Sequence, residues 1–295
     1  MKQFSVLIIF LIQSCSVFQQ SSYKQDIYLF DKKYSKKIKA HFEIIKKDKS
    51  KIEFYWTKPF KTKEKIPLIV FIHGHLRKRN GGGFYYYKHP MLKKVSSKYK
   101  AVAVSISQPG YGLSSGPPDY CGPKTQNAVM DVINYFKEKD YIDSNRIIIL
   151  GESRGAVVAS ILAGKYDIFK GLFLIGNFYD IRNFYNNYDK YYEGNEDVYD
   201  RIKSKIDRET SKSNQSYKVR SPISLSSNIR ALTWDIHGEN DEYDSEYAKK
   251  FIENIQRNNK KSKLIIIPGQ PHGIPYKIVD EKFYSFLKKL NVSKI

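Results

Sequence analysis

The sequence of 295 residues predicts an α/β domain, with a mostly parallel twisted sheet and helices on both of its faces. Three observations support this prediction. Continuous apolar runs recur along the chain, which is typical of strands that are covered on both faces. Helical patterns with one apolar face separate these runs, and strands that alternate with helices form parallel sheets. Hydrophobic residues make up 41% of the chain and aromatic residues 15%, which is enough for a sizeable core and excludes intrinsic disorder.

The expected strands extend from residue 38 to residue 267. Residues 38–46 and 51–56 predict an antiparallel pair. Residues 67–72, with the sequence PLIVFI, form the first continuous apolar run, and residues 231–236 form a more mixed one. Four further apolar runs complete the set of expected strands: residues 101–106, 146–150, 172–175 and 264–267.

Helical patterns lie between these strands. Apolar residues recur at helical spacing over residues 125–137 and again over residues 247–255. Residues 177–228 interrupt the alternation, because they hold no long apolar run and are dense in Tyr, Asn, Asp and Lys. This segment is too aromatic for a linker, so we expect an insertion of short helices that lies over the sheet edge as a lid. The alternative is a solvent-facing cover that only packs.

The N-terminal residues predict export to the bacterial cell envelope. Lys2 precedes an apolar stretch over residues 5–12, which is typical of a secretory signal and too short to span a bilayer. The following Ile12-Gln13-Ser14-Cys15 resembles the bacterial lipobox. This resemblance implies cleavage before Cys15 and acylation of its thiol, so that the protein is lipid-anchored to a membrane and faces the periplasm or the cell surface. An ordinary cleaved signal that happens to contain a cysteine is the alternative.

These expectations divide the chain into three parts. Residues 1–14 are the signal peptide, residues 15–25 are a lipidated tether, and residues 26–295 are the α/β domain with its insertion. Only two cysteines occur, Cys15 and Cys121, which excludes a disulfide framework and a Cys-rich zinc site. If Cys15 is lipidated, Cys121 is a free thiol.

The chain is strongly basic, since 51 Lys and Arg residues face 30 Asp and Glu residues and the formal net charge is +21. The excess consists of scattered lysines. It favours solubility and attraction to anionic surfaces or substrates, although a Lys-rich composition without functional meaning explains it equally well. No zinc-finger spacing, RNP-like stretch or basic heptad occurs, so we expect no specific binding of nucleic acid. The sequence carries no indication of an oligomeric state.

A candidate nucleophile lies in the pattern G-x-S-x-G, which occurs twice. The copy around Ser153 follows an apolar strand run and precedes a helical run, which is the context that a nucleophile elbow requires. The copy around Ser114 is followed by two prolines, which cannot continue a helix. We therefore predict Ser153 as the nucleophile and a loop role for Ser114. The alternative for Ser153 is a plain strand-to-helix turn with a serine near the helix N-terminus.

A serine hydroxyl needs a general base, and the base needs a carboxylate to orient it. His272 follows the last strand run, where its loop projects at the same sheet edge as Ser153. His73 and His237 end strands and precede glycines, so we expect structural roles in tight turns for them. Asp241, on the loop after residues 231–236, is the predicted acid. The alternatives on that loop, each of which can simply solvate it, are Glu239, Glu242 and Asp244.

A tetrahedral oxyanion needs two preorganised hydrogen-bond donors. The backbone N–H of Arg154, directly after the candidate nucleophile, is the first. The second is expected from the loop after the PLIVFI strand, where we predict the N–H of His75. The flexible run over residues 81–83, which contains three glycines, is an alternative donor or else a solvated surface loop.

Together these motifs carry a family resemblance. They are His73-Gly74, Gly110-Tyr111-Gly112, residues 151–156, Arg220-Ser221-Pro222-Ile223, residues 237–241 and Pro271-His272-Gly273. From about residue 38 to residue 290 the chain resembles the α/β-hydrolase superfamily, and in particular the catalytic domain of prolyl-oligopeptidase-like enzymes and related esterases. The order Ser, Asp, His is that of this superfamily. The resemblance implies that the last two motifs supply the acid, Asp241, and the base, His272.

The resemblance implies a serine hydrolase that cleaves an ester or amide bond in a small molecule or a peptide, through an acyl-enzyme and without a metal or organic cofactor. The implied enzyme is carboxylesterase-like or prolyl-oligopeptidase-like, and two departures from the family pattern make the resemblance firmer for a serine hydrolase than for a peptidase and leave the second oxyanion donor open. Family peptidases carry a large N-terminal propeller, which we do not expect here, and their His-Gly-Gly-Pro motif is His73-Gly74-His75-Leu76 in this chain. The alternative is a basic surface lipoprotein that keeps the fold and only binds ligands.

Overall fold

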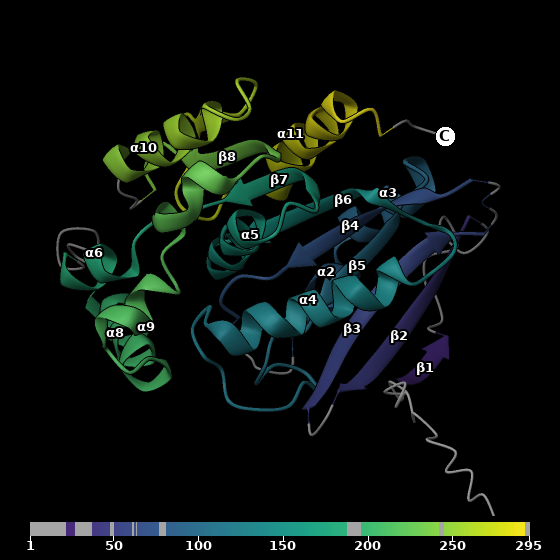
Figure 1. Cartoon of the computed structure of the whole chain (residues 1–295), viewed down its shortest axis with the longest axis horizontal. Coiled ribbons are helices and arrows are strands. Elements are labelled where there is room, and N and C mark those ends of the chain that lie inside the picture. The colour runs from purple at the N-terminus through teal and green to yellow at the C-terminus, as the bar shows by residue number, and fades with distance from the viewer. Residues whose placement is uncertain are drawn as a thin grey trace, which may run out of the picture.

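The computed structural model describes residues 22–26, 37–47, 50–60, 62, 64–76, 81–187, 196–241 and 245–292. Within these residues nine strands form one sheet in the order β1-β2-β3-β5-β4-β6-β7-β8-β9 (Figure 1). The expected signal peptide and Cys15 lie outside the described residues, as do two of the alternative acids, Glu242 and Asp244. No helix in the described part of the chain is long and apolar enough to cross a membrane.

The predicted fold class is confirmed, because the sheet is mostly parallel. The expected antiparallel pair is β2 (Ile38–Lys47) with β3 (Ser50–Pro59), and β3 also pairs in antiparallel fashion with β5. From β5 to β9 every neighbouring pair is parallel. These strands are β5 (Val102–Ile106), β4 (Ile66–Ile72), β6 (Ile142–Glu152), β7 (Phe169–Ile175), β8 (Leu232–Gly238) and β9 (Lys263–Ile267).

Two strands at the sheet edges differ from the sequence-based expectation. The tether expected over residues 15–25 ends earlier, because β1 (Ser22–Asp26) pairs with β2 in antiparallel fashion. An edge strand is held by backbone hydrogen bonds on one side, so the polar sequence SYKQD gave no signal for it. The apolar run in β9 was expected to be covered on both faces, yet Ile266 is 38% exposed because β9 forms the opposite edge of the sheet.

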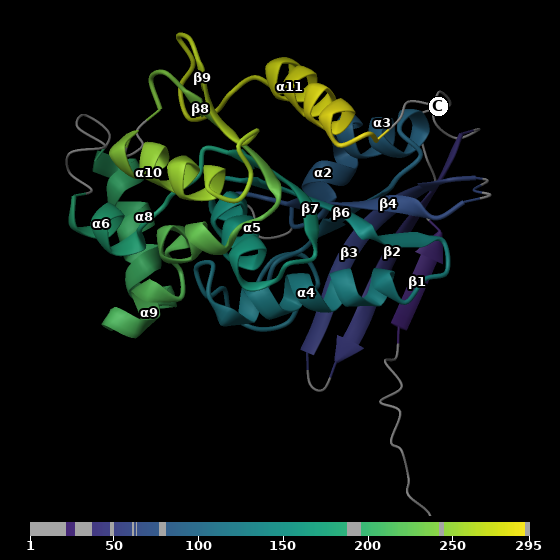
Figure 2. The same cartoon turned by 45° about the horizontal axis from the view of Figure 1, so that its top comes forward.

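Helices cover both faces of the sheet, as predicted (Figure 2). Alternate residues of β4 sort the core into two layers, because Leu68 and Val70 face one layer while Ile69 and Phe71 face the other. The first layer is completed by α4 (Pro123–Lys137), α5 (Arg154–Lys165) and α10 (Ser245–Gln256). The second is completed by α2 (Phe84–Lys88), α3 (Pro90–Lys98) and α11 (Tyr276–Lys289).

The segment between β7 and β8 is helical, as expected from its composition. Figure 1 shows α6, α8 and α9 beyond the end of the sheet toward which the parallel strands point. Ile206 and Tyr217 of this segment are buried in the same core layer as α4 and α5. The insertion is therefore packed onto the domain at the carboxyl edge of the parallel strands. Its helices are α6 (Ile181–Asn186), α8 (Glu196–Glu209), α9 (Asn214–Lys218) and the 3₁₀ helix η1 (Pro222–Asn228).

Candidate active site

Ser153 lies in a sharp turn between β6 and α5. Its φ is +52°, in the left-handed region that residues other than glycine rarely adopt, and its N–H donates to the Ile175 carbonyl at 2.7 Å. The two glycines of the motif are required by close approach, since a Cβ on Gly155 would lie 2.1 Å from the Ile72 carbonyl oxygen and one on Gly151 would lie 2.3 Å from that of Gly155. The turn thus has the geometry of a nucleophile elbow.

The second copy of the motif has a different environment. The Ser114 hydroxyl donates to the Ser107 carbonyl at 2.6 Å and accepts from the backbone N–H of Glu53 at 2.9 Å. The Glu53 carboxylate in turn accepts hydrogen bonds from the Ser107 hydroxyl and the Leu113 N–H. Ser114 is therefore a buried loop residue whose hydroxyl is occupied by structural hydrogen bonds, in agreement with its predicted role.

His272 and Asp241 meet on neighbouring loops that follow β9 and β8. Nδ1 of His272 lies 2.8 Å from Oδ1 of Asp241. Burial by itself raises the pKa of the Asp241 carboxyl, but the hydrogen bonds and charges of two histidines outweigh it and hold that pKa well below its usual range. Burial by itself lowers the pKa of His272, but its hydrogen bond with Asp241 and the charge of that carboxylate raise the pKa above the ordinary value.

The imidazole of His272 lies at the same sheet edge as Ser153. A Cβ on Gly176 would stand 2.7 Å from Cε1 of His272, and Gly176 directly follows Ile175, which accepts the N–H of Ser153. The Phe178 ring stacks on the imidazole with the ring centroids 5.7 Å apart. The side chain of His272 is 40% exposed, so it can be reached from solvent. The structure thus brings the three sequence-predicted residues to the ends of β6, β8 and β9.

Of the alternative acids to Asp241, the structure describes Glu239. Its side chain is exposed, and its carboxylate accepts a hydrogen bond from the N–H of Gly269 at 2.8 Å. The Glu239 carboxylate thus stabilises the turn after β9.

A second histidine, His237, binds the other oxygen of Asp241, and sequence reasoning missed this contact. Its Nδ1 lies 3.1 Å from Oδ2 of Asp241, and its Nε2 lies 2.6 Å from the Tyr179 hydroxyl and 3.4 Å from Oδ1 of Asp235. Burial lowers the pKa of His237, but the hydrogen bonds of Asp235 and Asp241 outweigh it and raise the pKa to about 9. His237 is therefore a buried cation at neutral pH. The available signal was its position four residues before the candidate acid.

The loop after β4 carries His75, whose N–H is the predicted second oxyanion donor, and it begins beside Ser153. The His73 carbonyl accepts a hydrogen bond from Nε2 of Gln108 at 2.5 Å, which fixes the start of this loop. A Cβ on Gly74 would lie 3.2 Å from the Cβ of Ser153, so the loop passes directly beside the nucleophile. The glycine run is less suitable as a donor, because the N–H of Gly83 donates to the Ser107 hydroxyl at 2.7 Å. His75 and Arg154 therefore remain the candidate donors.

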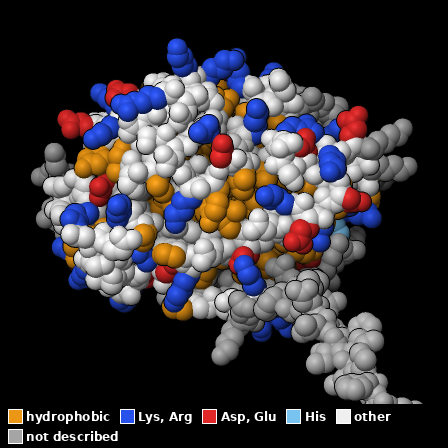
Figure 3. Space-filling view, viewed as in Figure 1, with side chains coloured by type: hydrophobic (Ala, Val, Ile, Leu, Met, Phe, Trp, Pro, Cys, Tyr) orange, Lys and Arg blue, Asp and Glu red, His pale blue; other side chains and the backbone are white. Residues whose placement is uncertain are grey.

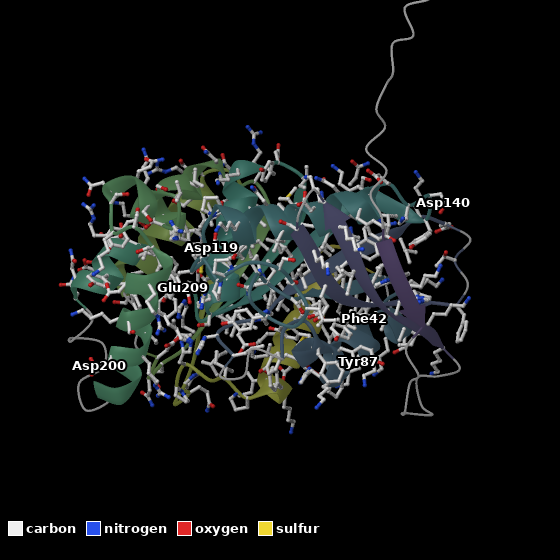
Figure 4. The ribbon with its side chains drawn as sticks, turned by 90° about the horizontal axis from the view of Figure 1, so that it is seen from below. Phe42, Tyr87, Asp119, Asp140, Asp200 and Glu209 are labelled. Carbon is white, nitrogen blue, oxygen red and sulfur yellow. The ribbon has the colours of Figure 1, made fainter. Side chains whose placement is uncertain are left out.

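Helix α8 of the insertion reaches the side chains beside the nucleophile. Nη2 of Arg154 donates to Oε2 of Glu209 at 3.1 Å, and the same oxygen accepts the N–H of Tyr120 at 2.9 Å. One turn earlier on α8, Nζ of Lys205 lies 2.6 Å from Nε2 of His75. Figure 4 shows Glu209 close to Asp119, whereas Asp200 of the same helix lies farther out. The insertion thus contacts both candidate oxyanion residues.

Comparisons with known proteins agree with this fold. A model of the prolyl oligopeptidase family matches residues 121–292. No curated protein sequence matches the chain significantly. An acetyl xylan esterase from Paenibacillus sp. R4 has the same fold, with 15% sequence identity and a TM-score of 0.65 over 92% of this chain and 89% of the esterase. An acylaminoacyl peptidase of Pyrococcus horikoshii has 19% identity and a TM-score of 0.66 over 87% of this chain and 42% of the peptidase. An esterase of Pyrococcus furiosus has 17% identity and a TM-score of 0.64 over 89% of this chain and 96% of the esterase. The expected α/β-hydrolase fold is confirmed, and the chain spans less than half the length of the peptidase.

Proposed function

Because this chain is a serine hydrolase that belongs to the prolyl oligopeptidase family, we propose that it cleaves carboxylic esters through an acyl-enzyme on Ser153. The observation that carries the proposal is the hydrogen bond of 2.8 Å between His272 and the buried Asp241, beside the strained turn that holds Ser153. A carboxylate in this position fixes the tautomer of the imidazole and stabilises the imidazolium that forms during the reaction.

The proposed reaction begins with attack of Ser153 Oγ on the ester carbonyl carbon while Nε2 of His272 takes the hydroxyl proton. The C–O bond to the leaving group then breaks, and the proton passes from His272 to the departing alkoxide. A water molecule, deprotonated by His272, attacks the acyl-enzyme, and its proton returns to Ser153 Oγ as the acid is released. The N–H groups of Arg154 and His75 stabilise the oxyanion in both halves of the reaction.

Amides are the second candidate substrate, because the matched family is named for an oligopeptidase. Esters come first because two of the solved structures with this fold are esterases, which align with the chain over 89% and 96% of their own length. Both reactions use the same nucleophile and base, so a screen of acyl esters against peptidyl amides separates them.

Labelling with a fluorophosphonate probe tests the catalytic assignment, because the probe reacts only with an activated serine. The wild-type protein is expected to be labelled and Ser153→Ala is not. Ser114→Ala, in the second copy of the motif, is the matched control and should keep the label in its folded fraction. An unlabelled wild type, or equal labelling of Ser153→Ala, would refute the assignment and would favour a protein that only binds ligands.

We also propose that the protein is exported and attached to a membrane through a lipid on Cys15. The support is the sequence Ile12-Gln13-Ser14-Cys15 after an apolar stretch. In cells that carry the lipoprotein pathway, Cys15→Ser should move the protein from the membrane fraction to the soluble fraction. An unchanged membrane fraction contradicts the lipid anchor and leaves the hydrolase assignment untouched.

A further inference from the structure

The side chain of Arg154 has hydrogen-bonding capacity that the folded chain does not use. It is 6% exposed, and only Nη2 is bonded, to Glu209. Nε and Nη1 are buried and have no hydrogen-bond partner. Buried N–H groups on a cation are costly when they stay unpaired, and such groups in native proteins call for a specific explanation. A ligand that accepts these hydrogen bonds would supply it.

The position of the guanidinium indicates which part of a substrate it faces. It lies 4.5 Å over the Tyr120 ring, in the chain segment that follows β5. In the sheet order, β4 and β5 lie on one side of β6, whereas the loops that carry His272 and Asp241 follow strands on the other side. The leaving group must lie near His272, which protonates it. The acyl group of the substrate therefore extends toward Arg154.

Several positively charged side chains of the described residues lie on this acyl side. Nζ of Lys205 lies 2.6 Å from Nε2 of His75, and the charges of Lys205, Arg154 and Arg201 all act on that ring. Partial burial and then these charges lower the pKa of His75 to about 4, so its ring is neutral at physiological pH. Glu209 is the acidic group bonded to Arg154. Among the described residues, positive charge from Arg154, Lys205 and Arg201 thus gathers on this side of the nucleophile, which favours an anionic ligand.

The positive charges beside His75 form a local cluster, distinct from the lysines scattered over the whole chain. Figure 3 shows Lys and Arg dispersed over the viewed face of the molecule and interspersed with Asp and Glu. The cations beside His75 are instead brought together by α8 and the turn after β6, from segments about 50 residues apart in sequence. The overall basic composition does not by itself place them beside the nucleophile.

We propose that the acyl group of the preferred substrate carries a carboxylate, which binds the unpaired N–H groups of Arg154, with Lys205 supplying a further positive charge beside His75. This inference rests on the proposed hydrolysis at Ser153. Guanidinium and carboxylate form strong charge-assisted hydrogen bonds. Because Arg154 also offers its backbone N–H to the oxyanion, the carboxylate and the reacting carbonyl are separated by a short chain. The substrate class is therefore monoesters of short dicarboxylic acids or of similar acidic acyl groups.

The test compares two esters that differ in charge and hardly in shape, monoethyl glutarate and its neutral amide analogue, ethyl 4-carbamoylbutanoate. The readout is the ratio of their kcat/KM values within each protein variant, from ethanol release. The wild type should prefer the anionic ester by about tenfold to a hundredfold. Arg154→Met should reduce the ratio to about one, and Lys205→Gln should reduce it several-fold. Lys170→Gln, an exposed lysine at the start of β7, is the matched control and keeps the wild-type ratio.

Glu209→Gln tests the same subsite without removing the arginine, and covers the case in which Arg154→Met does not fold. It removes the carboxylate that competes for the guanidinium, so the ratio should rise above that of the wild type. A wild type that is labelled at Ser153 but has equal kcat/KM values for the two esters overturns the anionic subsite alone. A ratio that falls in Glu209→Gln also overturns it. A wild type that is not labelled overturns the proposed function, and the subsite with it.

Discussion

The two sides of the nucleophile differ in which buried polar atoms lack a hydrogen-bond partner. On the side of β7 to β9, Asp241 bonds His272 through one oxygen and His237 through the other, and Tyr179 connects His237 with Asp235. On the side of β4 and β5, Arg154 retains two buried donors without partners. On the first side the unpaired atom is Oδ1 of Asp235, 3.4 Å from Nε2 of His237, while both oxygens of Asp241 are bonded, so the proposed proton transfer needs no rearrangement of Asp241. The second side is suited to binding, because a ligand can complete it.

Replacement of His272 should give the largest effect. His272→Ala removes the base that activates Ser153, and kcat should fall by about 10⁶-fold, as for loss of a base in other triads. Steady-state hydrolysis of a neutral ester measures the effect. His89→Asn, a histidine at the start of α3, is the matched control and should retain activity because Asn can also cap a helix. A loss of less than about a hundredfold would contradict the role of His272 as general base.

Asp241→Asn should lower kcat by about 10⁴-fold, because the amide no longer holds the required tautomer of His272. The variant should fold, since Asn is nearly the same size. The exposed Glu239 on the same loop provides the comparison, and Glu239→Gln should stay close to wild type. If Glu239→Gln is the more damaged variant in the same assay, the acid has been misassigned.

His237→Asn tests whether the stability of the region around β8 depends on the buried positive charge of His237. It leaves two carboxylates, Asp235 and Asp241, without their shared partner, so the free energy of unfolding should fall by about 3 kcal/mol. The pKa of His237 is raised to about 9, so its charge stabilises the fold fully below about pH 6.5, and this contribution is lost as the pH rises through about 9. Denaturant unfolding from pH 6 to pH 10 should show this loss in the wild type and a flatter profile in the variant. Parallel profiles would contradict the role.

The smallest expected effect is a shift in the pH dependence of kcat/KM. Activity requires neutral His272, whose pKa is raised by the hydrogen bond and charge of Asp241, with Glu152 adding to this and cationic His237 opposing it. The acid limb should therefore have its midpoint above pH 6.5, and in Asp241→Asn the midpoint should move down. Rate profiles with a neutral ester measure both. A wild-type midpoint at or below pH 6.5 would show that the charge of Asp241 is not felt at the base.

Most of the fold and the chain order of the candidate triad could be predicted from the sequence. The physical reasons differ between the strands, the elbow and the loops. Strands buried on both faces must be continuously apolar, so the runs in β4 and β6 were visible. The elbow at Ser153 needs glycines at fixed offsets because backbone atoms approach closely there. His272 and Asp241 each lie on the loop that follows a predicted strand, so their shared sheet edge followed from the parallel topology.

The features that could not be predicted are contacts between segments that lie far apart in the sequence. A local sequence pattern contains no information about such contacts. His237 looked like a turn residue, because nothing in the sequence shows which carboxylate its ring meets. The insertion has no apolar periodicity, so the approach of Lys205 and Glu209 of α8 to the nucleophile was not predicted. The orphaned donors of Arg154 likewise appear only when the packing around the guanidinium is known.

The short first strand has a consequence for where the enzyme works. β1 begins at Ser22, only seven Cα–Cα steps from Cys15, a span of at most about 25 Å when extended. If Cys15 is acylated as proposed, the β1 edge of the sheet is tethered close to the lipid headgroups. The enzyme then diffuses along the membrane surface and meets only substrate that comes close to it. Its turnover in the cell therefore depends on the substrate concentration next to the membrane.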